Sequence, residues 1–268
     1  MKNPNTMLIL AAGVALTASQ TAMAQYVSGD SWHRSTDWVP GSVAGSTANN
    51  PGPGFDGVGV WQYEYSTGGG GLTADTPWYA SDTTMLTWDD NWWNHGFGAW
   101  TKGDDAGTPI RQDRMTHNLT GSYFDEAPIV RWLMPSGTSD MRVDINGQFE
   151  VLWTGNELRG TSIDVDLVIA RETADGIIDV LFSDTLAKPT LGISVGDTAT
   201  SVVDLSEITL AEGDSLIFSG RGVSGIGWTE GRWMAIQDDL TISVNPIPAP
   251  ASLALLGLGG MAAARRRR

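Results

Sequence analysis

The sequence predicts an all-β body, an antiparallel β-sandwich, flanked by an N-terminal signal peptide and a C-terminal apolar helix. Three observations predict the sandwich. Short runs alternate apolar and polar residues with a period of two, which is typical of half-buried strands. Glycine is abundant, at 33 of 268 residues, and marks frequent turns. No helical periodicity separates the short strands, which favours a sandwich over an α/β fold.

The first clear strand of the body is predicted at residues 58–65. Trp61, Tyr63 and Tyr65 alternate there with Gln62 and Glu64. The three aromatic side chains therefore share one strand face, which is expected to lie in the core. The preceding stretch is rich in Pro, Gly, Ser and Asn and is expected to form a loop.

The strongest strand signals follow residue 128. Asn146-Gly147 is a dipeptide typical of a two-residue hairpin turn, and alternating runs flank it at residues 141–145 and 148–153. A hairpin is therefore predicted here. The tryptophans of the neighbouring aliphatic runs, Trp132 and Trp153, are expected in the core.

Asp175-Gly176 predicts a second hairpin of the same kind. Before it, Ile163, Val165, Leu167 and Ile169 would share one strand face and acidic residues the other. Further strands complete a total of about eight to ten. They are expected at residues 129–134, 177–182, 200–205, 215–218 and 240–244.

The order of these pieces resembles a jelly-roll domain that is common in secreted bacterial proteins. The resemblance would cover residues 55–245 and implies a jelly-roll-like antiparallel β-sandwich. Such domains look like carbohydrate-binding modules, some of which sit beside enzymes. The pieces that carry it are Val60-Trp61-Gln62-Tyr63, Val130-Arg131-Trp132 before Pro135, Gly147-Gln148-Phe149, residues 208–210 followed by Glu212-Gly213-Asp214, and the closing strand at 240–244.

Residues 1–24 have the three parts of a secretory signal peptide. Lys2 supplies a positive start, residues 7–16 are apolar, and Ala22-Met23-Ala24 is a small-x-small cleavage signature. Signal peptidase is expected to cut between Ala24 and Gln25. The alternative is an uncleaved N-terminal anchor, but the apolar run is shorter than the ~20 residues that a membrane span requires.

Residues 246–268 have a second three-part organisation. Three prolines break any preceding element, residues 251–264 form an apolar run, and a cluster of four arginines closes the chain. The run is shorter than a full span of ~20 residues, and the arginines favour a cytoplasmic end. A helix here is expected to insert into the membrane transiently.

This end closely resembles the PEP-CTERM sorting signal, with Pro248-Ala249-Pro250 where the family usually has Pro-Glu-Pro. The resemblance implies a Gram-negative bacterium that makes extracellular polysaccharide. It also implies an exosortase, a membrane enzyme that removes the tail, and a body (residues 25–245) placed at the cell envelope, the cell surface or the extracellular matrix. An ordinary C-terminal membrane anchor is the alternative and gives nearly the same location. The arginine cluster comprises Arg265, Arg266, Arg267 and Arg268.

The body without its two ends is strongly acidic. It keeps 11 of the 16 basic residues and all 31 acidic ones, a net charge of −20. Such a body repels phosphate backbones, which argues against nucleic acid as a partner. The chain has no cysteine, so neither disulfides nor thiol chemistry apply.

Residues 88–100 combine flat aromatic rings with hydrogen-bonding side chains, as a glycan-binding site requires. Tryptophan faces can stack on the C–H faces of pyranose rings. Polar side chains can form hydrogen bonds to sugar hydroxyls that lose their bonds to water on binding. Trp92-Trp93 is the best candidate, because adjacent residues of an extended strand cannot both point inward. The alternative is that the rings cap the core. The predicted ligand-binding residues are Trp88, Trp92, Trp93, Asn94, His95 and Trp100.

No catalytic residue, cofactor or metal ligand is predicted. The sequence contains no nucleophile elbow, HExxH motif or phosphate loop, and its three histidines lack metal-ligand spacing. A glycosidase would need two facing carboxylates, with candidates at Asp89/Asp90, Asp125/Glu126 and Glu150. A structural Ca²⁺ would find its ligands at Asp104-Asp105 or Asp238-Asp239.

The sequence therefore favours an exported, non-catalytic protein that associates with extracellular polysaccharide. A purely structural envelope protein and a polysaccharide-degrading enzyme are the alternatives. The first requires exposed tryptophans within residues 88–100, the second requires those rings to be buried, and the third requires two carboxylates that face each other across a groove.

Overall fold

The described part of the chain is built of strands alone. The computed structural model describes residues 30–47 (without 39, 43 and 45), 52–53, 59–66, 78–79, 83–89, 98–102, 109–118, 126–134, 140–154, 164–187, 199–222 and 233–245. These residues contain no helix, which confirms the all-β prediction. The strands are β1 (Ser31–His33), β2 (Gly52–Pro53), β3 (Gly59–Ser66), β4 (Thr83–Met85), β5 (Thr87–Asp89), β6 (Ala99–Thr101), β7 (Met115–Asn118), β8 (Pro128–Leu133), β9 (Met141–Thr154), β10 (Asp164–Glu172), β11 (Ile178–Ala187), β12 (Ala199–Leu210), β13 (Ser215–Gly222) and β14 (Trp233–Asn245).

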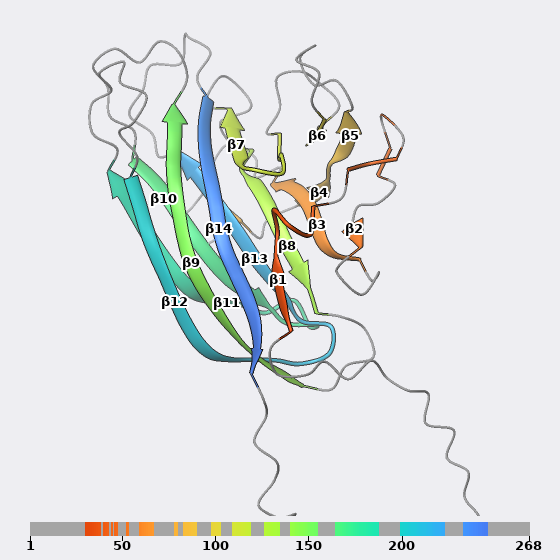
Figure 1. Cartoon of the computed structure of the whole chain (residues 1–268), viewed down its shortest axis with the longest axis vertical. Helices are drawn as coiled ribbons and strands as arrows, with labels where there is room; N and C mark the ends of the chain where they lie inside the picture. Colours follow the sequence, from red (N-terminus) through yellow and green to blue (C-terminus); the bar gives the residue numbers. More distant parts are fainter. Residues whose placement is uncertain are drawn as a thin grey trace, which may run out of the picture.

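Two antiparallel sheets form a sandwich (Figure 1). The five-stranded sheet has the order β1-β14-β9-β12, with β7 also paired to β14. The seven-stranded sheet has the order β11-β10-β13-β8-β3-β2, with β4 also paired to β3, and β5 and β6 form a separate ribbon. From β8 onward the chain changes sheet at every connection except the β10–β11 hairpin. Strands that are neighbours in a sheet are therefore far apart in sequence.

The core lies between the sheets and is rich in aromatic rings. Trp61, Tyr63 and Tyr65 of β3 are buried, as their alternation predicts, and so is Trp132 of β8. The ring centroid of Trp132 lies 5.0 Å from that of Trp32 in an edge-to-face contact between the two sheets. Such a contact adds about 1 kcal/mol to the stability gained by burial.

Strand β10 follows the predicted alternation. Val165, Leu167 and Ile169 are buried in the main core. Ile163 lies outside the described residues, as does the side chain of Trp153 in β9. The turn at Asp175-Gly176 is confirmed, since it joins β10 to β11 and Gly176 has a left-handed φ of 80°.

The predicted hairpin at Asn146-Gly147 is wrong. Strand β9 runs without interruption from Met141 to Thr154, and Gly147 pairs with Val203 of β12 on one side and with Leu240 of β14 on the other. A Cβ on Gly147 would lie 2.0 Å from the carbonyl oxygen of Asp239. Gly147 therefore allows β9 and β14 to approach each other closely, and it does not form a turn.

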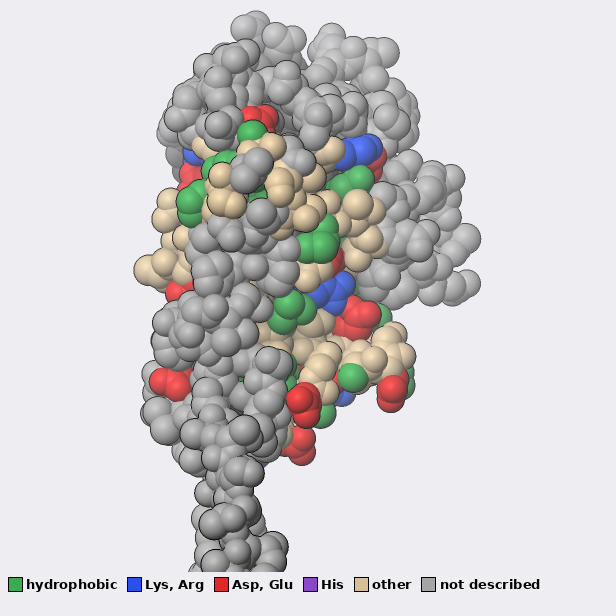
Figure 2. All heavy atoms as spheres, turned by 90° about the vertical axis from the view of Figure 1, so that its right-hand side faces the viewer, with side chains coloured by type: hydrophobic (Ala, Val, Ile, Leu, Met, Phe, Trp, Pro, Cys, Tyr) green, Lys and Arg blue, Asp and Glu red, His purple; other side chains and the backbone are tan. Residues whose placement is uncertain are grey.

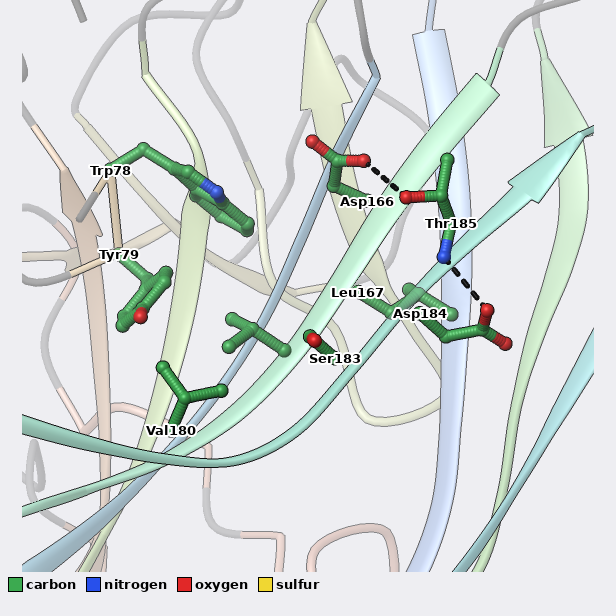
Figure 3. A pocket seen from close by; sticks show the side chains of 9 residues that line it. Trp78, Tyr79, Asp166, Leu167, Val180, Ser183, Asp184 and Thr185 are labelled. Atoms are coloured by element: carbon green, nitrogen blue, oxygen red, sulfur yellow. Dashed lines mark hydrogen bonds between the residues drawn. The ribbon is translucent and has the colours of Figure 1, made fainter. Parts of the chain in front are cut away.

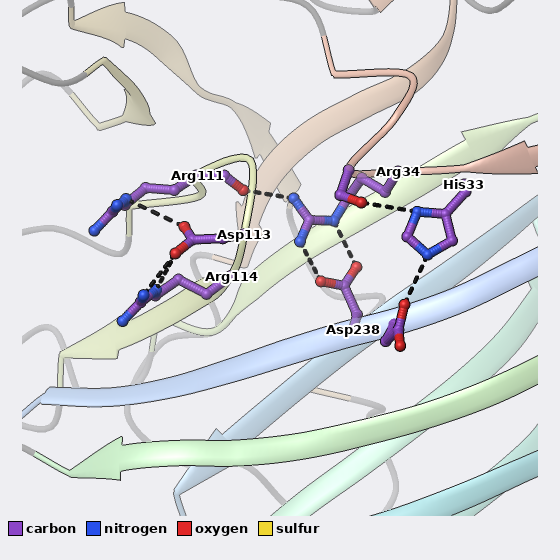
Figure 4. A network of polar contacts seen from close by, with 8 residues as sticks. His33, Arg34, Arg111, Asp113, Arg114 and Asp238 are labelled. Carbon is purple, nitrogen blue, oxygen red and sulfur yellow. Dashed lines mark hydrogen bonds and ion pairs between the residues drawn. The ribbon is translucent and has the colours of Figure 1, made fainter. Parts of the chain in front are cut away.

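A buried ion pair attaches the N-terminal segment to β14 (Figure 4). The Arg34 side chain is 2% exposed, and its Nε donates a hydrogen bond to Asp238 Oδ2 at 2.5 Å, beside a second bond from Nη2 to Oδ1. Burial alone would lower the pKa of Arg34, but the charge and hydrogen bonds of Asp238 raise it. Arg34 Nη1 also donates to the carbonyl oxygen of Arg111 at 2.5 Å.

Further polar contacts hold the same segment. His33 Nε2 lies 2.8 Å from Asp239 Oδ1 on β14. Asp37 accepts hydrogen bonds from the His33 backbone N–H at 2.8 Å and from Trp61 Nε1 at 3.1 Å, which ties the segment to β3 as well. Residues 33–37 therefore contact both sheets.

Nearby, Asp113 lies between two arginines (Figure 4). Burial would raise the pKa of Asp113, but the hydrogen bond from Arg114 and the charges of Arg111 and Arg114 lower it below its usual value. The ionised Asp113 carboxylate pairs with both Arg111 and Arg114. This group lies next to the Arg111 carbonyl oxygen that accepts a hydrogen bond from Arg34.

Replacing Gly147 by alanine should destabilise the sandwich strongly. Gly147→Ala is expected to lower the free energy of unfolding by about 2–4 kcal/mol through the backbone clash and the strained φ. Gly176→Ala is the control, because nothing lies within 4 Å of a Cβ there, and it should cost only about 1 kcal/mol. Urea unfolding measures both, and equal losses would contradict the close approach at Gly147.

Removing Arg34 should cost more than removing an exposed cation. Arg34→Met leaves Asp238 buried without a partner and should lower the free energy of unfolding by about 3–5 kcal/mol, and Arg34→Met/Asp238→Leu should recover much of that loss. Arg142→Met breaks the exposed pair with Glu207 and should cost about 1 kcal/mol or less. Urea unfolding measures these losses. A loss of similar size in Arg34→Met and Arg142→Met would refute the special role of the buried Arg34–Asp238 pair.

Candidate functional site

Two tryptophans of the predicted glycan platform lie in the core. Trp88 of β5 is 8% exposed and Trp100 of β6 is 0% exposed. The two residues pair across the β5–β6 ribbon with ring centroids 5.3 Å apart. Trp100 stacks on Tyr63 at 5.8 Å, and Trp88 contacts Trp38 at 6.3 Å. Their faces are occupied by other rings, so the prediction that these two residues stack on a glycan is corrected to core packing.

Gly98 explains how the Trp88 ring fits. A Cβ on Gly98 would lie 2.1 Å from Trp88 Cζ2, so the absence of a side chain at this position makes room for the indole. The space at Gly98 is therefore filled by the protein's own indole. Trp92, Trp93, Asn94 and His95 lie outside the described residues, and their role in glycan binding stays a prediction.

The acidic pair Asp238-Asp239, a candidate for calcium, is already engaged by basic side chains. Adjacent residues of a strand point to opposite faces, and Asp238 binds Arg34 inside while Asp239 binds His33 outside. Within the described ranges, no group of three or more His, Asp and Glu residues is placed to hold a metal ion. The other pair, Asp104-Asp105, falls outside those ranges.

The described histidines are held by the protein itself. His117 is buried, and its Nδ1 accepts a hydrogen bond from the Gly222 backbone N–H at 3.2 Å. His33 contacts Asp239, and its Nδ1 lies 2.9 Å from the Ser35 hydroxyl. Both side chains therefore have structural partners.

A pocket of about 390 Å³ lies on the outer side of the seven-stranded sheet, beside β10 and β11 (Figure 3). Trp78 and Tyr79 form one side of it, and strands β10 and β11 form the other. We call it the β10–β11 groove. It is lined by Trp78, Tyr79, Asp166, Leu167, Val168, Val180, Ser183, Asp184 and Thr185.

The aromatic side of the groove is fixed by packing. Tyr79 is buried against a small apolar cluster on the outer face of the sheet, which includes Val168 and Ile217, and burial raises the pKa of its phenol. Trp78 meets Tyr79 edge to face at 5.3 Å. The guanidinium carbon of Arg221 lies 4.8 Å from the Trp78 ring centroid, an attraction of about 0.5–1 kcal/mol that orients the half-buried indole.

The strand side of the groove is polar. Asp166 Oδ1 accepts a hydrogen bond from the Thr185 hydroxyl at 2.9 Å, and Asp184 Oδ1 accepts one from the Thr185 backbone N–H at 2.8 Å. Arg221 Nη2 lies 3.6 Å from Asp166 Oδ2. The Ser183 hydroxyl lies on the exposed β11 strand, between these groups and Val180.

This arrangement suits the recognition of a polar ring with apolar faces. The Trp78 indole and Val180 offer apolar contact surfaces. The carboxylate and hydroxyl groups of the strand side can form hydrogen bonds to polar groups of a ligand that lose their bonds to water. The volume falls within the range of about 300–1,000 Å³ that is usual for ligand pockets. The geometry provides binding contacts and no activated nucleophile.

Sequence reasoning did not predict this site. An acidic face of β10 was predicted, but no binding role was assigned to it. Trp78-Tyr79 was not singled out, because its contact with β10 joins segments almost 90 residues apart. The only local signal was an aromatic pair within a loop-rich stretch.

The carboxylates proposed for catalysis do not form a facing pair among the described residues. Glu126 is bound by Lys102 Nζ at 2.6 Å. Glu150 lies on β9 of the five-stranded sheet, and Asp89 lies on the β5–β6 ribbon. Asp90 and Asp125 lie outside the described residues.

The C-terminal end matches a known sorting signal. Residues 246–268 match the PEP-CTERM protein-sorting motif, which confirms the prediction made for this end. The motif indicates a protein that an exosortase processes during export to the cell surface or the extracellular space. In the part of the chain that the structure describes, no helix is long and apolar enough to cross a membrane. The helix predicted at residues 251–264 lies outside that part.

Comparison of the body with known proteins gives weaker similarities. No curated protein matches the sequence significantly. Solved structures with similarity include a CBM4 structure, with 8% identity over 49% of this chain and 84% of that chain and a TM-score of 0.28. The cellulose-binding domain of β-1,4-glucanase C from Cellulomonas fimi shares 10% identity over 55% and 86%, with a TM-score of 0.29. A CocE/NonD family hydrolase from Staphylococcus aureus shares 11% over 55% and 36%, with a TM-score of 0.30. At these scores the similarities assign neither a ligand nor an activity to this chain.

The burial of Trp100 gives a direct test of its role. Trp100→Ala should lower the free energy of unfolding by about 3–5 kcal/mol, because it empties a packed aromatic site. Trp78→Ala makes the same chemical change at a half-buried ring and should cost clearly less. Urea unfolding followed by circular dichroism measures both losses. A Trp100→Ala variant as stable as Trp78→Ala would return Trp100 to the list of candidate ligand-binding residues.

Proposed function

We propose that this chain is an exported, non-catalytic surface or matrix protein that binds extracellular polysaccharide in the β10–β11 groove. One observation carries the proposal: an oriented indole, Trp78, faces the hydroxyl and carboxylate groups of Asp166, Ser183 and Thr185 across a pocket. A pyranose ring would stack on Trp78 and Val180. Its hydroxyls would bond to the polar strand side, which offsets the loss of their water contacts.

The proposed organisation of the chain follows from its ends and its strand order. Signal peptidase removes residues 1–24 at Ala24-Gln25, residues 25–245 form one jelly-roll body, and residues 246–268 insert transiently into the membrane before an exosortase removes them. The regular change of sheet between successive strands supports the jelly-roll assignment. Pro248-Ala249-Pro250 and the four arginines would serve as the sorting motif.

The polar contacts of Glu64 and Glu172 support a non-catalytic role. Arg131 on β8 binds Glu64 of β3 and Glu172 of β10 together. Its Nη1 also donates to Ser215 Oγ at 2.8 Å. A glycosidase requires one carboxyl group that is protonated and a second that faces the sugar. Carboxylates held by the same guanidinium are poorly suited to either task.

Affinity electrophoresis tests the proposed function. The chain from Gln25 to Asn245 would migrate through gels loaded with a panel of neutral, acidic and amino polysaccharides. Retardation by at least one of them is expected. Trp78→Ala should weaken that retardation by about tenfold or more in apparent Kd, as expected for the loss of a central aromatic contact. Val202→Ala, an exposed change on the other sheet, is the matched control and should migrate like the parent.

A second variant separates the two candidate sites. Trp92→Ala/Trp93→Ala removes the adjacent rings of the predicted aromatic platform. If this variant loses retardation while Trp78→Ala keeps it, the platform is the glycan site and the groove assignment is wrong. If no polysaccharide retards the folded parent, the chain is better described as a structural envelope protein. Release of reducing sugar from the retarding polysaccharide would instead indicate an enzyme.

A further inference from the structure

The last strand of the sandwich ends where the sorting signal begins. Strand β14 ends at Asn245, and the matched motif starts at residue 246. Strand β14 is bonded to β9 along one side and to β1 and β7 along the other. The chain therefore leaves the body from a firmly held point rather than from a free edge.

The pairing of the strands places several turns close to this exit point. Asn245 pairs with Arg142 of β9, which pairs with Thr209 of β12. Asp214 Oδ1 accepts a hydrogen bond from the Ala174 backbone N–H at 3.2 Å, which joins the β12–β13 turn to the β10–β11 turn. We call this end the tail pole, and it lies at the lower end of the strands in Figure 1. It comprises residues 30, 140–142, 173–177, 209–215 and 245.

The β10–β11 groove lies along the side of the sandwich, and its lining runs from Val180, which is three residues from the tail pole, to Thr185. Glu172, at one end of β10, pairs with Ser215 at the tail pole, whereas Asp166 pairs with Arg221. Asp166 is six residues from Glu172 along the same strand, which is about 20 Å at ~3.3 Å per residue. Because Trp78 stacks on Arg221, which pairs with Asp166, Trp78 lies at the end of the groove that is farther from the tail pole.

The spacer between body and membrane segment is short. Five residues separate Asn245 from the apolar run that begins at Ala251, and three of them are prolines. An extended proline-rich spacer of this length covers about 15 Å. The body measures about 40 Å along the thirteen residues of β14. An inserted tail would therefore hold the tail pole close to the bilayer and the opposite ends of the strands far from it.

Surface charge disfavours a body that lies flat on the lipid. Asp140, Asp175 and Glu212 are exposed at the tail pole, and Figure 2 shows acidic side chains on the described surface toward that end. The sides of the sandwich are acidic as well, since the body has a net charge of −20 by its composition. Anionic lipid repels the tail pole and the sides alike, so the short spacer, and not surface charge, decides which end lies near the bilayer.

We infer that the tail pole faces the membrane while the sorting signal is attached, and that the groove then opens from the side of the sandwich. The orientation follows from the exit point of β14 and the short spacer, and its benefit for glycan binding rests on the function proposed above. The chain would then meet polysaccharide outside the cell before its tail is removed. Its body requires no rearrangement for this, because the groove and the exit point belong to one sandwich.

A pair of single-cysteine variants tests the orientation. The chain contains no cysteine, so one introduced thiol carries one fluorophore. Asp175→Cys places it at the tail pole, and Asp164→Cys places it at the far end of β10. Both positions are exposed and both substitutions remove one carboxylate. Residues 25–268 are reconstituted into vesicles of phosphatidylethanolamine and phosphatidylglycerol that contain a lipid with a quencher on its headgroup.

The expected result is strong loss of fluorescence at position 175 and little loss at position 164. Equal loss at both positions, a greater loss at 164, or no loss at either would overturn the orientation. Removing residues 246–268 should abolish the quenching at both. Glu212→Cys and Thr200→Cys form a second pair. The label at position 212 should be quenched as strongly as that at 175, and the label at position 200 as little as that at 164. Because glycan retardation is measured without vesicles, failure of the orientation and failure of glycan binding are seen separately.

Discussion

The buried ion pair between Arg34 and Asp238 is the contact on which the rest of the sandwich depends. Two charges in a core are tolerated only when they bind each other closely, so the pair requires the N-terminal segment and the last strand to be in place together. Arg34 also binds the carbonyl group of Arg111. One guanidinium therefore joins three segments that are far apart in sequence. In a chain without cysteine, this contact supplies a cross-link that disulfides supply in many secreted domains.

Aromatic side chains make up a large part of the core of the described body. Trp32, Trp100 and Trp132 are fully buried, and their rings meet other rings rather than solvent. A sandwich with a large aromatic core tolerates long loops, since each buried ring removes much apolar surface from water. Most of the tryptophans whose side chains the structure describes therefore serve the core. Trp78, held by Tyr79 and Arg221, instead lines the β10–β11 groove.

The fold also separates the sorting signal from the groove that is proposed to bind glycan. The sorting signal leaves at one pole of the sandwich, and the β10–β11 groove lies along the outer face of the other sheet. Strand β14 holds the exit point in place, because it is bonded to β9 along its length and to β7 and β1 near its two ends. Removal of the tail beyond Asn245 would leave every described strand intact, so the same body can serve before and after processing.

The sequence by itself determined the sorting motif, the all-β class and the inward faces of β3, β8 and β10. These features depend on local order along the chain, namely a run of residue types or a period of two, and local order needs no knowledge of partners. The tertiary structure alone decided the role of Gly147, the burial of Trp88 and Trp100, and the β10–β11 groove. Each of these depends on a neighbour distant in sequence: Asp239 beside Gly147, Tyr63 beside Trp100, and Trp78 above β10. A glycine in an Asn-Gly pair and a tryptophan in a polar stretch look the same in sequence whether or not another strand packs against them, so only the assembled sheets could reveal what they contact.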